Sequence, residues 1–502
     1  MIIRHTDYNI EAIDLAELKN PPLQLLGHEY ASRYACIPIR HEGNRLWVAM
    51  ENPHCINTLT DLADLTGLTI VPMLAGATDI RRRLDQFYSK EAMDTIASQF
   101  LVEERLQLRE EVPDEALLKQ LTAAPAVRLI DSVIESGVLN RASDIHIEPY
   151  GPYLRARYRV DGNLTTSGVV DLSLLPNVIS RLKIMGDLDI TEKRLPQGGH
   201  FTMNFLGNRI EFRLSTMPTY LGEKAAIRLL YGQSGRLKKE ELGFFASDIE
   251  RITQLFHLPH GAIYMTGPTG SGKSTTLTCF LEELNQESRN IITVEDPVEN
   301  PLMGVNHVEV EKSGGLDFAN ALRHILRQDP DVIMIGEIRD EETARIATQA
   351  AITGHVVLST LHTNDAAGVI ERLIDMGIEP YLVASALNGI ISQRLVRRIC
   401  TECITPTNLT DNDAKLLGLT KDSSAFVGAG CIRCNNTGFK GRTAIYEYVI
   451  MTEDLRRRIS ENPTQLAIHI RKTQGLRACA AKNVQLGHTT ANEVLRILDS
   501  EL

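Results

Sequence analysis

The segment AIYMTGPTGSGKST, residues 262–275, decides the fold of this chain. A short apolar run opens it, and a glycine-rich stretch and a helical pattern over 275–284 follow. Residues 267–274 match G-x-x-x-x-G-K-[ST] in full, between the strand and the helix that the motif requires. An ordinary glycine-rich turn is the competing interpretation, and the flanking elements argue against it. The segment therefore predicts a loop that binds the phosphates of a nucleotide.

The residue types of this loop suit phosphate chemistry. Glycines allow backbone N–H groups to wrap the phosphates, and the N-terminus of the following helix adds a favourable dipole. We expect Lys273 to reach the β- and γ-phosphates of ATP and Ser274 to hold Mg²⁺. The predicted nucleotide-binding residues are Gly267, Pro268, Thr269, Gly270, Ser271, Gly272, Lys273, Ser274 and Thr275.

Further apolar runs lie along the same part of the chain and alternate with helical patterns. The expected strands are 262–265, 291–294, 332–335 and 356–359. Near-continuous apolar strands of this kind are typical of a parallel sheet covered by helices on both faces. We therefore predict an α/β domain around the phosphate-binding loop.

Carboxylates follow two of these strands. Glu337 comes after the run 332–335 with Gly336 between them, and Glu295 opens the acidic stretch 295–299. Acidic residues at strand ends often only cap helices. Both segments, however, lie at carboxyl ends of strands, where α/β sheets bind ligands. We predict catalytic roles for Glu295 and for Glu337, which would polarise water or hold the Mg²⁺ shell.

His355 and His362 bracket the expected strand 356–359. A lone histidine is usually structural, whereas two histidines near a γ-phosphate could sense that phosphate. We include both histidines among the candidate catalytic residues.

Two smaller units are expected before the α/β domain. The first, residues 30–89, shows a hairpin pattern and helical patterns near 57–66 and 78–88, with a strand pattern at 68–72. Polar, acidic residues 90–124 suggest a linker or a solvated helix. In the second unit a helix and alternating strands place arginines on one face of a sheet. The expected elements there are 127–139, 145–147, 154–162, 209–213 and 226–230.

Composition limits the class of protein. The net charge of −11 disfavours a general nucleic-acid binder, because phosphate contacts need clustered lysine and arginine. No run approaches the roughly 20 apolar residues of a membrane-spanning helix, and the first residues lack the apolar core of a signal peptide. We therefore expect a cytoplasmic protein, whose association with any membrane must come through a partner.

Together these motifs resemble the secretion ATPase superfamily that includes the GspE, PilB and PilT proteins. The loop 267–274, the acidic stretch 293–299, Gly336-Glu337 and the histidine segment 354–364 occur in the order of that family. The resemblance implies ATP hydrolysis by a homohexameric ring of RecA-like domains. It implies partners among the platform and cytoplasmic components of a secretion or pilus machine, and no nucleic acid.

The resemblance also implies a PAS-like second domain whose arginines reach the nucleotide across a domain interface. Arg213 and Arg228 match those arginines best, although a merely solvated sheet face is the alternative. One departure lies nearby, since the family's Pro-Gln-Asp-Gly is here Pro196-Gln197-Gly198-Gly199. Residues 1–40 lack the Arg-Leu-Gly motif with which some relatives bind cyclic di-GMP, so we predict no such binding.

Four cysteines form two Cys-x-x-Cys pairs separated by 27 residues. Two such pairs supply the four thiolates of a closed tetrahedral Zn²⁺ site, whereas a redox pair or incidental core cysteines are the alternatives. The predicted zinc ligands are Cys400, Cys403, Cys431 and Cys434. The secretion and pilus-extension branch of the family resembles this pattern, and the retraction branch lacks it.

The expected architecture follows from these observations. We predict a docking domain over 1–90, a linker over 91–125, a PAS-like α+β domain over 126–235 and a RecA-like ATPase domain over 236–502 with a zinc lobe at 398–436. The expected function is powering type II secretion, with type IV pilus assembly as the alternative. A nucleotide-dependent scaffold and a DNA-translocating motor are weaker hypotheses, opposed by the intact Lys273 and Glu337 and by the acidic charge.

Overall fold

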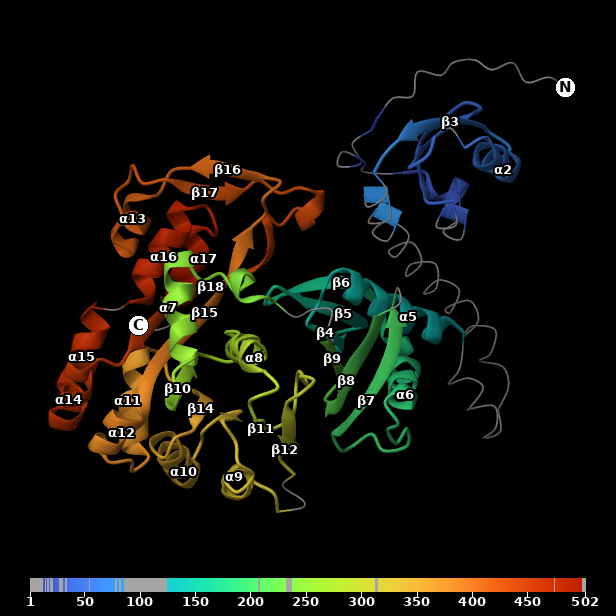
Figure 1. Cartoon of the computed structure of the whole chain (residues 1–502). Helices are drawn as coiled ribbons and strands as arrows, with labels where there is room; N and C mark the ends of the chain where they lie inside the picture. The colour runs from blue at the N-terminus through green and yellow to red at the C-terminus, as the bar shows by residue number, and fades with distance from the viewer. Residues whose placement is uncertain are drawn as a thin grey trace. The chain divides into compact units, whose positions relative to one another are not determined.

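The computed structural model describes residues 34–53, 55–76, 124–205, 208–231, 237–311, 315–473 and 475–498, with shorter pieces between 12 and 31 and between 79 and 84. The chain forms two compact units, Met1–Tyr231 and Gly232–Leu502 (Figure 1). Residues 91–123 of the linker expected over 91–125, and most of the helix expected near 78–88, lie outside the described residues. Ala124 and Pro125, expected at the end of the linker, instead begin a helix. Among the described residues, no helix is long and apolar enough to cross a membrane.

The N-terminal part of the first unit contains a three-stranded sheet. Strands β1 (Cys36–Glu42) and β2 (Arg45–Met50) pair antiparallel, and β3 (Thr69–Leu74) runs parallel to β2. Helix α2 (Ile56–Thr66) connects β2 to β3 and buries Leu62 in the same core as the sheet. The hairpin, helix and strand expected from the sequence are all present.

The rest of the first unit is a six-stranded antiparallel sheet in the order β6-β5-β4-β9-β8-β7. The strands are β4 (Asp144–Tyr150), β5 (Tyr153–Val160), β6 (Asn163–Asp171), β7 (Gln197–Phe205), β8 (Asn208–Thr219) and β9 (Gly222–Leu230). Helices α5 (Ala124–Leu139) and α6 (Leu175–Met185) pack against one face and share its apolar core. The arginines of β5, β8 and β9 lie on the other face because side chains alternate along a strand.

The second unit is built on a seven-stranded sheet in the order β12-β11-β13-β14-β10-β15-β18. All neighbours are parallel except the pair β15 and β18. The strands are β10 (Gly261–Thr266), β11 (Ile291–Glu295), β12 (Asn306–Glu309), β13 (Val332–Ile335), β14 (Val356–Leu361), β15 (Leu387–Ile399) and β18 (Phe439–Ile450). The expected parallel strands are present, and β12, β15 and β18 are added to them.

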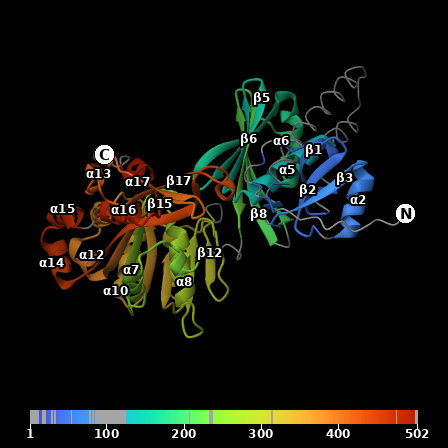
Figure 2. The same cartoon turned by 90° about the horizontal axis from the view of Figure 1, so that it is seen from above.

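Helices cover both faces of this sheet (Figures 1 and 2). Ile263 and Met265 of β10 pack in one core with α7 (Ala246–Phe256) and α8 (Lys273–Leu284). Ala262 and Tyr264 face the opposite core, formed with α9 (Phe318–Ile325), α10 (Glu341–Ile352), α11 (Ala366–Asp375) and α12 (Pro380–Ala386). All four residues are buried, which explains the unbroken apolar run that precedes the phosphate-binding loop.

The segment between β15 and β18 forms a separate lobe. It holds the short pair β16 (Ile404–Thr407) and β17 (Ala425–Gly428) and the helix α13 (Asp411–Leu417). Leu409 and Leu417 of the lobe pack with α16 (Leu476–Gln485) and α17 (Ala491–Leu498). Helices α14 (Glu453–Glu461) and α15 (Pro463–Thr473) complete the C-terminal part and pack beside α12 and α11.

Candidate functional site

The phosphate-binding loop joins the carboxyl end of β10 to the start of α8, which begins at Lys273, two residues earlier than expected. Gly272 caps this helix with a φ of 86°, in the left-handed region that glycine adopts without strain. Gly267 has a φ of 142°, and a Cβ there would lie 2.3 Å from the carbonyl oxygen of Gln393. Both positions therefore require glycine for reasons of backbone geometry and space.

The ammonium group of Lys273 lies inside the loop. Its Nζ donates to the carbonyl oxygens of Gly267 at 2.7 Å and of Pro268 at 3.0 Å, and the residue is only 8% exposed. Burial lowers the pKa of Lys273 to about 8; the nearby Arg394 cation also lowers it, while the Glu337 carboxylate acts in the opposite direction. A phosphate placed in the loop would favour the charged form of Lys273.

Strand β15 supports this loop from the side, which the sequence did not reveal. The Nε2 of Gln393 donates to the carbonyl of Ser271 at 2.8 Å, and its Oε1 accepts from the Thr276 hydroxyl at 2.9 Å. The buried Arg394 guanidinium donates to the carbonyls of Gln393 and Asn364. The available signal was the polar run Ser392–Arg394 between the apolar pairs Ile390-Ile391 and Leu395-Val396. Polar groups in such a setting are buried only when they are hydrogen-bonded.

The structure brings Glu337 and His362 together beside the loop. The Thr266 hydroxyl, at the end of β10, donates to the carbonyl of Thr363 at 2.8 Å and so ties the segment after β14 to the phosphate-binding loop. The Nε2 of His362 lies 3.4 Å from Oε2 of Glu337, whose other oxygen accepts from Arg339. The carboxylate is largely buried, with 16% of its side chain exposed.

Glu295 ends β11, the strand next to β13. A Cβ on Gly336 would lie 3.4 Å from the Cα of Glu295, so the residue before Glu337 lies directly beside the end of β11. The Oε1 of Glu295 is 2.9 Å from Nδ1 of His307. His307 was not singled out in the sequence, where it stands among alternating polar and apolar residues.

His355 lies at the amino ends of the parallel strands, opposite to the phosphate-binding loop. Its carbonyl accepts from the amide of Gly261, the first residue of β10, whereas the phosphate-binding loop follows the last residue of that strand. Six residues of strand, roughly 20 Å, separate the amino end of β10 from its carboxyl end. The expectation that His355 lies near the γ-phosphate site of its own chain is therefore wrong, and only His362 of the two histidines is beside the loop. The Nδ1 of His355 is instead 3.0 Å from the carbonyl of Ala350.

Arg213 and Arg228 belong to the first unit and face each other in register across β8 and β9. Arg228 donates from Nε to Asp144 at 3.1 Å and is largely exposed. On the neighbouring strand β5, the Nε of Arg159 lies 3.8 Å from Oδ2 of Asp144. This row of the sheet thus combines three guanidinium groups with one carboxylate, and its excess positive charge suits an anion.

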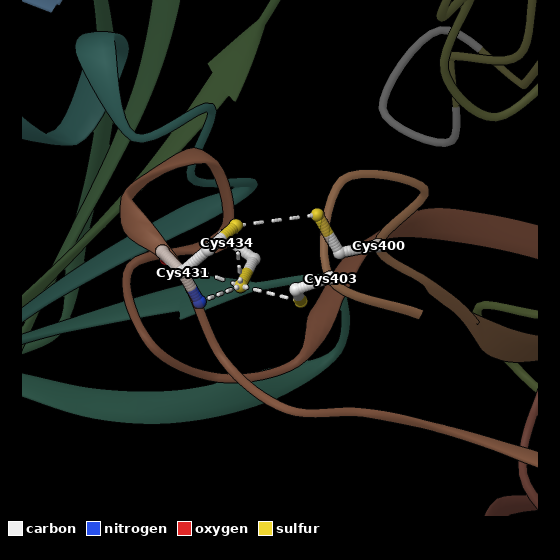
Figure 3. Close-up of side chains that lie close together, drawn as sticks. All are labelled: Cys400, Cys403, Cys431 and Cys434. Atoms are coloured by element: carbon white, nitrogen blue, oxygen red, sulfur yellow. Dashed lines mark hydrogen bonds between the residues drawn. The ribbon is translucent and has the colours of Figure 1, made fainter. Parts of the chain in front are cut away.

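The four predicted zinc ligands form one cluster, with all sulfur atoms within 4.8 Å of one another. Figure 3 shows the four side chains turned toward one another from the two ends of the lobe. The Sγ–Sγ separations are 3.8 Å for Cys400–Cys431, 3.9 Å for Cys403–Cys434 and 3.7 Å for Cys431–Cys434. A tetrahedral ion with metal–sulfur bonds of about 2.3 Å would hold its ligands about 3.8 Å apart. The cluster has the size of such a site.

The backbone around the cluster favours thiolate at Cys434. Burial opposes ionisation of this thiol, but the amides of Cys431 and Gly438, each donating to its Sγ at 3.2 Å, help to lower its pKa to about 7. Burial raises the pKa of Cys403 to about 12 and also raises the pKa of Cys431, so these two thiols, unlike Cys434, favour the protonated form. Metal ligation requires deprotonated cysteine, and a bound ion would displace their protons. Cys400 and Cys403 lie just beyond β15, and Cys431 and Cys434 lie just before β18.

A comparison with known protein families settles the family. The family model for type II/IV secretion system proteins matches residues 119–496, and the MshEN domain model matches residues 8–94. The chain belongs to the type II/IV secretion system protein family. The secretion ATPase resemblance found in the sequence is thereby confirmed, and the chain is an ATPase of this family. The expected lack of cyclic di-GMP binding stays a prediction.

Individual relatives of this secretion ATPase fall on both branches considered above. A type II secretion system protein E from Aeromonas hydrophila is 44% identical over 396 residues, covering 78% of this chain and 79% of the relative. A type IV pilus assembly ATPase PilB from Myxococcus xanthus is 39% identical over 503 residues, covering 97% of this chain and 89% of the relative.

Solved structures support the α/β ATPase fold. The pilus retraction motor PilT with bound ADP has a TM-score of 0.50 and 28% identity, covering 73% of this chain and 95% of that protein. The Legionella pneumophila ATPase DotB has a TM-score of 0.56 at 22% identity, covering 74% of this chain and 95% of that protein, and shows the fold alone.

Proposed function

We propose that this chain hydrolyses ATP at residues 267–275 to power protein export by type II secretion, through assembly of a pseudopilus. The observation that carries the proposal is the gathering of Lys273, Glu337 and His362 at the carboxyl ends of neighbouring parallel strands. These strand ends are where α/β sheets bind their ligands. The 44% identity with a type II secretion system protein E supports the choice of machine.

In the proposed reaction, water attacks the γ-phosphorus of ATP, the bond from that phosphorus to the β-phosphate oxygen breaks, and ADP and phosphate leave. Lys273 and the loop amides hold the phosphates, and Ser274 would hold Mg²⁺, which neutralises the developing charge. Glu337, with Glu295 on the neighbouring strand, would orient the attacking water and accept its proton. His362, 3.4 Å from Glu337, would contact the γ-phosphate and report its departure.

Arg213 and Arg228 would supply positive charge to the phosphates from the PAS-like domain of 126–235, across a domain interface in a homohexamer. Their register and the excess positive charge of their row support this role. The net charge of −11 supports protein partners, namely platform and cytoplasmic components of the machine, over nucleic acid. We place the protein in the cytoplasm, peripheral to the inner membrane, with residues 1–90 as the docking domain.

The four-cysteine cluster would hold one structural Zn²⁺. Sulfur separations of 3.7–3.9 Å support a tetrahedral ion closed to water. Zinc would tie the two ends of the lobe together where it leaves β15 and enters β18, and its binding free energy would become folding free energy.

Type IV pilus assembly is the second candidate, and one observation favours it. The pilus assembly ATPase PilB relative matches 97% of this chain, whereas the type II relative matches 78%. Deleting the gene in its source organism and complementing with wild type or Lys273→Ala tests both functions. Loss of exported proteins from the medium, with surface pili intact, supports type II secretion. Loss of surface pili with normal export favours the pilus machine, and rescue of either function by Lys273→Ala contradicts an ATP-driven role.

A further inference from the structure

We propose that His307 is a positioning residue that fixes the carboxylate of Glu295 for ATP hydrolysis. His307 lies on β12, the edge strand of the sheet, directly opposite Thr293 of β11. The proposal rests on the catalytic role proposed above for Glu295.

The hydrogen bonds of the imidazole determine which nitrogen carries the proton. The backbone amide of Leu302 donates to Nε2 of His307 at 2.9 Å, so this nitrogen is an acceptor. In neutral imidazole the other nitrogen, Nδ1, must then be the donor. Nδ1 lies 2.9 Å from Oε1 of Glu295 and 2.8 Å from Oγ1 of Thr293. One backbone amide therefore sets the tautomer that allows His307 to donate to the carboxylate.

Two donors converge on the same carboxylate oxygen. The Thr293 hydroxyl donates to Oε1 of Glu295 at 2.7 Å, and His307 approaches Oε1 from the neighbouring strand. Within the described parts of the chain, no side chain bonds to Oε2 of Glu295. With Oε1 held from two directions, the plane of the carboxylate is fixed and Oε2 is left to accept from a water molecule.

The surroundings make this arrangement rigid. The side chains of His307 and Glu295 are 12% and 13% exposed, so little solvent competes for their hydrogen bond. Two further hydrogen bonds connect the segment that starts at Glu295 to β12 and the residue after it. The amide of Val298 donates to the Glu309 carboxylate at 3.0 Å, and the amide of Val310 donates to the carbonyl of Glu295 at 2.9 Å. His307 thus links the acidic segment after β11 to a strand that does not itself carry catalytic groups.

Two substitutions separate the hydrogen bond that His307 accepts from Leu302 from the contacts of its Nδ1. His307→Phe keeps a flat ring but removes both nitrogens. His307→Asn retains an N–H near the position of Nδ1 and gives up the acceptor for Leu302. We expect His307→Phe to lower kcat for ATP about 10- to 100-fold, with KM changed less than about twofold, because misplacing a catalytic group costs rate rather than substrate binding. We expect His307→Asn to recover kcat to within about threefold of wild type.

The matched control is His257→Phe, at an exposed histidine that ends α7, and it should leave kcat and the unfolding temperature unchanged. His307→Asn as slow as His307→Phe would overturn the proposal, since the Leu302 bond, and not the Glu295 bond, would then carry the effect. Wild-type kcat in His307→Phe would overturn it as well.

Glu295→Ala separates failure of this inference from failure of the function proposed for Glu295. If Glu295→Ala turns over ATP at the wild-type rate, Glu295 has no catalytic role and both proposals fall. If Glu295→Ala is slow but His307→Phe is normal, only the positioning role of His307 falls. The double variant should be no slower than Glu295→Ala alone, and a further loss of about tenfold in the double variant would contradict a role acting through Glu295.

Discussion

The side-chain amide of Gln393 donates to the backbone carbonyl of Ser271 across 2.8 Å and so connects β15 to the phosphate-binding loop. Its Oε1 accepts from the hydroxyl of Thr276 on α8. Gln393 is 2% exposed, so neither bond exchanges readily with water. One side chain from a neighbouring strand therefore holds both the loop and the first turn of α8.

Gln393→Leu, which keeps a similar volume, should loosen the loop. The Ser271 carbonyl and the Thr276 hydroxyl would lose buried partners, at a cost of about 1–3 kcal/mol each in the free energy of unfolding. We expect weaker ATP binding and a lower unfolding temperature. Thr276→Val is the matched control, because it removes only one of the two bonds and should cause the smaller change. Equal ATP affinity in wild type and Gln393→Leu, measured by calorimetry, would show that the loop does not depend on β15.

Glu337→Gln should still bind ATP but hydrolyse it at least about 100-fold more slowly, because the amide cannot accept a proton from water. Gln has nearly the same shape, so the contact with Arg339 and the fold should survive. Turnover and equilibrium binding of ATP are measured on the same preparation. A folded Glu337→Gln protein that no longer binds ATP would make Glu337 a binding residue instead.

Much of the ATPase unit follows from local sequence. The apolar strands and the Gly267–Lys273 loop have short-range patterns, and the four parallel strands appear as expected. The polar strands β6 and β7 were missed because they form the two edges of their sheet and bury few side chains. His307 and Gln393 act through contacts with residues distant in sequence or on a neighbouring strand, which no local pattern encodes.

The misplacement of His355 has a different cause. Two histidines that bracket a strand of six residues must lie at opposite ends of that strand, since each residue advances the strand by about 3.3 Å. Only His362, at the carboxyl end of β14, can be near the loop at the carboxyl end of β10. The geometry of parallel strands therefore excludes His355 from the site of its own chain.

Arg213 and Arg228 should act across an interface. We expect Arg228→Ala to lower turnover most in the assembled ring, because it removes positive charge from the phosphates without touching the ATPase core. Mixing Arg228→Ala subunits with Lys273→Ala subunits should restore part of the activity if the arginine acts on the nucleotide of a neighbouring subunit. Arg209→Ala, on the same strand as Arg213, is the control. Mixed rings without recovery would place the contact within one chain, or leave Arg228 as a solvated pair with Asp144.

Wild-type protein purified under reducing conditions without chelator should contain one Zn²⁺ per chain. Replacing Cys431 and Cys434 by Ser should abolish that zinc, because two thiolates cannot close the site. Leu409 and Leu417 pack with α16 and α17, so we expect unfolding confined to the segments around the cysteines and a lower unfolding temperature. Cys279→Ser, outside the cluster, should keep its zinc.

The same double-Ser variant tests what the zinc lobe does. The cysteines follow β15 and precede β18, and they contribute no group to the phosphate-binding loop, so intrinsic ATP turnover should fall far less than in Lys273→Ala. A zinc content near zero in the wild type would contradict the proposed metal site. A turnover as low as that of Lys273→Ala, with the ring still assembled, would mean that the lobe is coupled to hydrolysis.

The function proposed for this chain depends on ATP hydrolysis at the loop 267–275. The decisive measurement is the steady-state rate of phosphate release by purified Lys273→Ala, compared with wild type at saturating ATP and Mg²⁺. Among the described residues, the hydrogen bonds of the Lys273 ammonium go to carbonyls of the loop itself, so its loss should leave the fold intact, as judged by the unfolding temperature. We predict phosphate release indistinguishable from background. Phosphate release at the wild-type rate from the folded variant would contradict the account.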